Sequence, residues 1–290
     1  MKRLLRSIVN RIPPRVIKRI AAWQFSSPFA AQIIRWGSRV IRNQDGVIRY
    51  GQGADLKFNT GNANPGYALG TTEPLVQDVL GCILRPGDVF FDIGANVGFY
   101  TVIGARLVGP MGRVFAFEPF PENAAAARHN AELNAFHTIT VLEDAVSDVS
   151  GEGELLLAAE PTWAKLDFTG SHSSTHGRLK VNLVRIDDLI EQKVVEPPAL
   201  VKIDVEGAEV EVLRGMAGTV AAFSPLILCE NHGRNEQVAG LLNGFGYWQV
   251  VLENPGKDLR ESPWDVHVLA GPPSREELLR KVSLRLAHSD

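Results

Sequence analysis

Residues 89–100 read VFFDIGANVGFY, and this stretch decides the fold. It begins with an apolar run of strand length, continues through a turn that contains Gly94 and Gly98, and leads into a helical pattern over Phe99–Val108. Glycine permits the tight turn that joins a strand directly to a helix. Because similar segments precede and follow it, we expect residues 89–108 to be one unit of a repeating strand–helix arrangement.

Apolar runs of strand length recur along the chain, with helical patterns between most of them. The further strand candidates are Val114–Phe117, Ile139–Leu142, Leu200–Ile203 and Leu226–Leu228, and the helical patterns cover Pro74–Leu84, Glu122–Asn134, Glu209–Phe223 and Glu236–Phe245. Continuous apolar strands that alternate with helices indicate a parallel sheet covered on both faces. We therefore predict a doubly wound α/β fold. Tyr247–Leu252 and Val266–Ala270 are expected to form an antiparallel hairpin at the sheet edge.

The overall composition is typical of a globular protein. The chain has 290 residues, of which 45% are hydrophobic and 22% are charged. Cys82 and Cys229 lie far apart, which argues against a disulfide framework and favours a reducing, cytoplasmic location. There is no apolar run long enough to cross a bilayer.

The charge is distributed unevenly along the chain. Residues 1–44 contain ten of the 30 basic residues and none of the 33 acidic ones, so the rest of the chain is acidic. Apolar residues recur at helical spacing in this segment, which predicts a basic amphipathic helical arm over residues 1–45. The simpler interpretation is that these helices pack on the domain at 46–290 with their arginines facing water. The alternative is peripheral contact of residues 1–44 with an anionic membrane at its inner face, because basic amphipathic helices often lie on such surfaces. The acidic part of the chain after residue 44 would repel phosphates, so we expect no nucleic-acid partner.

Three strand ends carry polar groups that suit a nucleoside ligand. In doubly wound sheets, ligands bind outside the carboxyl ends of the strands. Asp92, Gly94 and Gly98 follow the first core strand, and there they would hold an amino-acid-like end of a ligand. Glu118 ends the next strand and suits both hydroxyls of a ribose, whereas Asp144 and Ala145 follow the third strand and suit an adenine. S-adenosylmethionine has these three parts.

The last two parallel strands end in residues that suit acceptor chemistry. Asp204 and Glu206 follow the fourth strand, and Glu230 and His232 follow the fifth. These side chains are candidates for binding a substrate hydroxyl and for general-base catalysis, to which histidine is well matched at neutral pH. The alternative for Asp204 and Glu206 is that they cap the next helix. No spacing of ligands demands a metal, so we expect none.

The chain resembles the FkbM-type family of S-adenosylmethionine-dependent methyltransferases. The resemblance spans about residues 67–270, and its clearest motifs are D-x-G-x-N-x-G, which ends at Gly98, and K-I-D-V-E-G-x-E, which begins at Lys202. It implies a Rossmann-like, mostly parallel seven-stranded sheet of the class I methyltransferase type. It also implies a methyl acceptor hydroxyl on a sugar, glycolipid, polysaccharide or other small natural product. The Asp92–Gly98 loop, including Asn96, would hold the cofactor with Glu118, and Asp144 would lie near adenine.

Three other functions are compatible with parts of this pattern. A nicotinamide-dependent oxidoreductase shares the sheet, but it prefers G-x-G-x-x-G to the G-x-x-x-G spacing found here. A nucleic-acid methyltransferase would use the basic arm, but the two carboxylates Asp204 and Glu206 would repel phosphates. A non-catalytic membrane-surface protein could retain the fold alone. The sequence leaves the oligomeric state open.

Overall fold

The computed structural model describes residues 43–157, 164–166 and 177–287. The predicted basic arm, apart from residues 43–45, lies outside the described residues. No helix in the described ranges is long and apolar enough to span a membrane.

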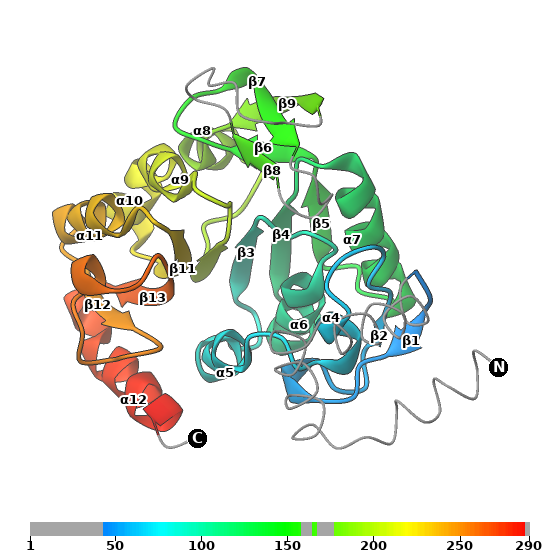
Figure 1. Ribbon diagram of the computed structural model, residues 1–290, viewed down its shortest axis with the longest axis horizontal. Helices are drawn as coiled ribbons and strands as arrows, with labels where there is room; N and C mark the ends of the chain where they lie inside the picture. Colours follow the sequence, from blue (N-terminus) through cyan, green and yellow to red (C-terminus); the bar gives the residue numbers. More distant parts are fainter. Residues whose placement is uncertain (1–42, 158–163, 167–176, 288–290) are drawn as a thin grey trace, which may run out of the picture.

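The central feature is a seven-stranded sheet with the order β12-β13-β11-β10-β3-β4-β5 (Figure 1). The five adjacent strands from β11 to β5 pair in parallel, and β13 runs antiparallel to both of its neighbours, β11 and β12. The strands are β3 (Val89–Ile93), β4 (Arg113–Phe117), β5 (Ile139–Leu142), β10 (Leu200–Ile203), β11 (Leu226–His232), β12 (Trp248–Val251) and β13 (Asp265–Gly271). This confirms the predicted α/β class, the implied seven strands and the antiparallel pairing of the last two strands.

Helices cover both faces of this sheet. The strands carry apolar side chains on both faces, so each face must be buried against other elements. Successive residues of a strand point to opposite faces, so Phe90 packs in one core and Phe91 in the other. Full burial of each such ring contributes about 1.5–3 kcal/mol. One core involves α5 (Pro74–Ile83), α6 (Phe99–Val108) and α12 (Glu276–Ala287), and the other involves α8 (Ile186–Glu191), α9 (Glu209–Gly215), α10 (Ala217–Phe223) and α11 (Asn235–Gly244).

The remaining elements flank the sheet. Helix α7 (Pro121–Leu133) packs beside α6 and β5, and the pair β1 (Gly46–Val47) and β2 (Lys57–Phe58) precedes the short helix α4 (Gly66–Leu69). A second sheet lies beyond the β4–β5 end of the main sheet in Figure 1. Its strands are β6 (Asp144–Val146), β7 (Gly151–Leu157), β8 (Ala164–Leu166) and β9 (Gly177–Val184), in the order β6-β9-β7-β8. The sequence patterns did not predict this sheet.

The predicted helix over Glu209–Phe223 is instead two helices. It is interrupted at Met216, directly after Gly215. A Cβ atom at Gly215 would lie 1.9 Å from the carbonyl oxygen of Ser147. The close approach of this backbone therefore requires glycine at a point where the apolar periodicity indicates one continuous helix.

The strand register aligns the functional residues at one edge of the sheet. Ile93 lies opposite Phe117 on one side and Ile203 on the other, and Ile203 lies opposite Cys229. The residue that follows each of these four belongs to the predicted site: Gly94, Glu118, Asp204 and Glu230. Because the strands are parallel and in this register, the four residues share one row across the sheet.

Gly94 allows two of these strand ends to approach closely. Its φ is +79°, and a Cβ atom there would lie 1.7 Å from the carbonyl oxygen of Asp204. An L-residue at this φ is strained, and the clash with a backbone atom adds to that strain.

We expect Gly94→Ala to lower the free energy of unfolding by about 2–5 kcal/mol, because strain and overpacking combine at this position. Gly240→Ala is the matched control: Gly240 is exposed in α11, and nothing lies within 4 Å of an added Cβ. The control should stabilise the helix by up to about 1 kcal/mol. Urea unfolding of both variants measures this difference, and equal stabilities would contradict the close-approach argument.

Candidate functional site

A cavity of about 470 Å³ lies at the carboxyl ends of the parallel strands. This size suits a small-molecule ligand. The cavity is lined by residues from every strand end of the predicted site. Residues of the segment before α5 and of the loop before β13 complete the lining. Its lining includes Asn62, Tyr67, Glu73, Gly94, Asn96, Glu118, Phe120, Asn123, Asp144, Ala145, Leu155, Asp204, Glu206, Glu230, His232, Trp264 and Asp265.

The loop after β3 is held in shape by its own polar contacts. Asn96 has a φ of +51°, a conformation that asparagine tolerates better than most residues, and its backbone N–H donates to Glu118 Oε2 at 2.7 Å. Gly94 and Asn96 line the cavity. Gly98 does not line it; a Cβ atom there would lie 2.9 Å from the Cβ of Ala127, so this glycine allows α6 and α7 to pack together.

Asp92 lies beneath the loop rather than on the cavity wall. It is fully buried, and its Oδ2 accepts a hydrogen bond from Thr101 Oγ1 at 2.6 Å. In the sheet register it lies opposite Lys202. The side chain therefore supports the turn from inside, while its buried Oδ1 has no hydrogen-bond partner among the described residues, so contact between Asp92 and a ligand stays a prediction.

Glu118 is held so that both of its carboxylate oxygens have fixed positions. Oε2 accepts from Asn96 N–H, and Oε1 accepts from Phe120 N–H at 2.9 Å. Burial raises the pKa of Glu118 to about 7, although these two backbone hydrogen bonds favour the charged form. A carboxylate oxygen accepts more than one hydrogen bond, so Glu118 can also receive two hydroxyl groups of a ligand in the cavity.

The third strand end forms a mixed polar and apolar wall. Asp144 begins β6, and its Oδ1 accepts from Asn182 Nδ2 on β9 at 2.7 Å. Ala145 follows it and lies on the cavity wall near Leu155 of β7 and Phe120. A flat heterocycle with exocyclic nitrogen donors fits such a wall. The second sheet thus completes this end of the cavity.

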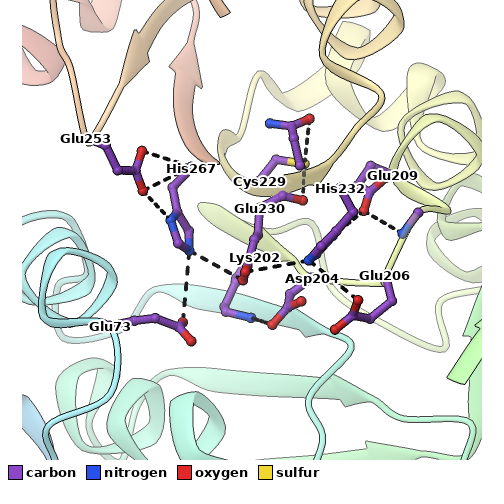
Figure 2. Close-up of polar contacts among 12 residues, drawn as sticks. Glu73, Lys202, Asp204, Glu206, Glu209, Cys229, Glu230, His232, Glu253 and His267 are labelled. Atoms are coloured by element: carbon purple, nitrogen blue, oxygen red, sulfur yellow. Dashed lines mark hydrogen bonds and ion pairs between the residues drawn. The ribbon is translucent and has the colours of Figure 1, made fainter. Parts of the chain in front are cut away.

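Asp204, Glu206, Glu230 and His232 come together as one acidic cluster around an imidazole (Figure 2). His232 Nε2 lies 3.6 Å from Glu230 Oε1 and 3.7 Å from Glu206 Oε2. Its other nitrogen, Nδ1, lies 2.8 Å from Oε1 of the fully buried Glu209. The ring is therefore oriented by Glu209 and presents Nε2 to the two carboxylates at the cavity.

The carboxylates change the proton affinity of this imidazole. Burial disfavours the charged ring, but Glu209 and Glu230 outweigh it and raise the pKa of His232 to about 10. The pKa of Glu230 is lowered despite its burial, because it faces the imidazoles of His232 and His267. In the protein without ligands, His232 is therefore protonated at neutral pH.

Sequence reasoning missed several residues that shape this site. Lys202 is buried within β10, and its Nζ lies 3.0 Å from Asp204 Oδ2 and 4.8 Å from the centre of the Tyr100 ring. Its signals in the sequence are its place inside an apolar strand and at the first position of the K-I-D-V-E-G-x-E motif. Glu73, Glu209, Trp264 and His267 also shape the site. Glu209 is the last residue of the K-I-D-V-E-G-x-E motif, whereas no local pattern identifies the other three.

Comparison with known proteins is consistent with this geometry. The profile of the methyltransferase FkbM domain matches residues 92–259. The chain is 32% identical to the hexuronic acid methyltransferase AglP of Haloferax volcanii over 52% of the chain and 61% of that protein. It is 31% identical to the 31-O-demethyl-FK506 methyltransferase FkbM of Streptomyces tacrolimicus over 60% of the chain and 78% of that protein. It is 29% identical to the 2-O-methyltransferase NoeI of Sinorhizobium fredii over 48% of the chain and 61% of that protein.

If Glu118 receives ribose hydroxyls, the affinity for S-adenosylhomocysteine should depend on pH. Hydroxyl donors require the carboxylate form, so affinity should be full above pH 7 and fall by up to about tenfold per pH unit below it. Glu118→Gln should weaken binding at pH 8 by more than about tenfold, or 1.4 kcal/mol, and abolish this pH dependence. Calorimetric titration measures both effects. The exposed neighbour Glu122→Gln should behave as wild type, and a pH-independent wild type would contradict the assignment.

The pKa of His232 gives a second test of the site, and this test requires no methyl acceptor. Glu209→Gln keeps an acceptor for Nδ1 but removes a negative charge, so the pKa of His232 should fall below its value of about 10. Nuclear magnetic resonance titration of the ring nitrogens measures it directly. A His232 pKa that is the same in both proteins would show that Glu209 does not control the ring.

Proposed function

Because the chain belongs to the FkbM family of S-adenosylmethionine-dependent methyltransferases, we propose that it methylates a hydroxyl group of a neutral sugar or glycan. The observation that carries the proposal is the continuity of one cavity from Glu118 to the cluster of Asp204, Glu206, Glu230 and His232. The first end suits a nucleoside and the second suits a hydroxyl group.

The residues of the cavity fit S-adenosylmethionine. Glu118, which offers two fixed carboxylate oxygens, would hold the ribose, and Asp144 with Ala145 would hold the adenine. The loop at Gly94 and Asn96 would lie along the amino-acid part. When bound, this cofactor supplies an electrophilic methyl group on a sulfonium. The nearby carboxylates are matched in charge to such a cation.

The acidic cluster would bind and orient the acceptor hydroxyl. Carboxylates accept hydrogen bonds from hydroxyl groups, and Asp204, Glu206 and Glu230 surround the point that His232 Nε2 faces. The same charges disfavour an anionic acceptor at this position. We therefore infer that the reacting part of the acceptor is neutral, in contrast to a free uronate.

Trp264 supports a sugar as the acceptor. Its side chain is half exposed on the cavity wall, and its ring meets the His232 ring edge-to-face at 5.6 Å between centres. An exposed aromatic face next to hydrogen-bonding carboxylates suits a sugar ring, whose apolar C–H face and polar hydroxyl edge require both kinds of contact.

His232 is our candidate for the group that receives the hydroxyl proton. Nε2 points to the cluster, while Glu209 holds Nδ1, so the ring is positioned as a general base requires. The surrounding carboxylates stabilise the protonated form of the His232 ring, so the ring must lose this proton before it can act as a base. A cation bound beside the cluster would lower the pKa of His232 and so favour the neutral base.

The direct test is transfer of a deuterated methyl group from S-adenosylmethionine to panels of neutral sugars, uronic acids, polyketide alcohols and amines, detected by mass spectrometry. We expect transfer to a hydroxyl of a neutral sugar or glycan. Methylation confined to amines or carboxylates would overturn the proposal.

With an acceptor in hand, His232→Gln should lower kcat by about 10²–10⁴-fold while the affinity for S-adenosylhomocysteine changes less than about twofold. The control is His129→Gln, because His129 is exposed and pairs with Asp45 on the surface. It should retain wild-type turnover. Full activity of His232→Gln would exclude His232 as the base.

A further inference from the structure

A second group of potential ligand atoms lies beside the acceptor cluster. It consists of Glu73, Glu230 and His267, whose ligand atoms all lie within 4.8 Å of one another. Glu73 directly precedes α5, Glu230 is in β11, and His267 lies opposite Glu230 in β13. Figure 2 shows Glu230 between the two imidazoles, with His267 on one side and His232 on the other.

His267 is oriented as a metal-binding histidine is. Its Nδ1 lies 2.6 Å from Glu253 Oε1, and its backbone N–H also donates to that carboxylate. This contact orients the ring so that Nε2 faces Glu230 and Glu73, and an ion bound there would displace the Nε2 proton that these carboxylates stabilise. His267 is only 9% exposed, yet its buried Nε2 has no hydrogen-bond partner.

The distances around Nε2 are those of ligands that share an ion. Nε2 lies 3.4 Å from Glu230 Oε2 and 4.0 Å from Glu73 Oε2. Two ligands bound at about 2.1 Å to one tetrahedral metal ion are about 3.4 Å apart. The three atoms therefore need only a small shift to reach a common cation.

Glu73 is held in place at a conformational cost. Its φ of +42° is in the left-handed region, which is unfavourable for glutamate, and Tyr100 Oη donates to its Oε2 at 2.6 Å. Strain of this kind is found where a side chain must be placed for function. In the described part of the chain, the ion pairs of Glu73 and Glu230 involve histidines alone. Lys202 Nζ is instead in contact with Asp204.

We propose that Glu73, Glu230 and His267 bind a divalent transition-metal ion, with Glu253 and Tyr100 orienting the ligands. One imidazole and two carboxylates suit Mn²⁺ or Zn²⁺. Glu230 belongs to this site and to the acceptor cluster, so the ion would lie next to the acceptor hydroxyl. The proposal goes beyond methyl transfer, and its test measures metal binding, so its failure leaves the function proposed above intact.

The experiment is titration of the full chain, freed of metal by chelator and dialysis, with Mn²⁺ followed by electron paramagnetic resonance and with Zn²⁺ followed by calorimetry. We expect one equivalent of at least one of these metals to bind. His267→Gln and Glu73→Gln should each weaken this binding by about tenfold or more. His129→Gln should leave it unchanged, and His232→Gln should change it less than about threefold.

Three results would overturn the proposal. Absence of binding of both metals at millimolar concentration would show that His267 acts only as an ion-pair partner of the glutamates. Loss of binding in His232→Gln but not in His267→Gln would place the ion on Asp204, Glu230 and His232. Equal loss in both histidine variants would place it between the two imidazoles.

Glu253→Gln serves if His267→Gln does not fold. It keeps all three proposed ligands and removes only the charge that orients the His267 ring. We expect its metal affinity to fall by about tenfold or more, since loss of such a partner typically has that effect. Unchanged affinity in folded Glu253→Gln, together with unchanged affinity in Glu73→Gln, would also contradict the site.

Discussion

The buried ammonium of Lys202 is the interaction on which the site depends. It lies in the middle of the parallel sheet, opposite Asp92 in β3 and in contact with Asp204 at the end of its own strand. Burial alone would lower the pKa of Lys202, but the surrounding carboxylates Asp204 and Asp92 raise it above its ordinary value. Breaking such a buried pair leaves an uncompensated charge, which typically costs about 3–5 kcal/mol. The ammonium thus permits an unusual density of carboxylates at the strand ends.

Much of the fold and part of the site could be predicted from the sequence because both follow from short-range patterns. The apolar runs define the parallel strands, and parallel strands bring their carboxyl ends to one edge. Glu118, Asp204 and Glu230 were therefore identified from their positions directly after apolar runs. The register then places them in one row, although they are far apart in the chain.

The rest depends on contacts that no local pattern contains. His267 reaches Glu230 only because β13 is antiparallel to β11 in one particular register. Glu73 enters the cavity from the segment before α5. The second sheet depends on the pairing of β9, which alternates polar and apolar residues, with β6 and β7 from an earlier part of the chain. Asp92 is buried beside Thr101, a contact that its place near the end of an apolar run does not reveal.

Strand ends in register form one cavity, and we propose that its Glu118 end binds a nucleoside and its acidic cluster binds the methyl acceptor. The most direct test is a crystal structure of the protein with S-adenosylhomocysteine. We expect the ribose hydroxyls to bind the carboxylate of Glu118 and the sulfur atom to face the cluster of Glu230 and His232. A ribose bound elsewhere, or a sulfur atom directed away from this cluster, would contradict it.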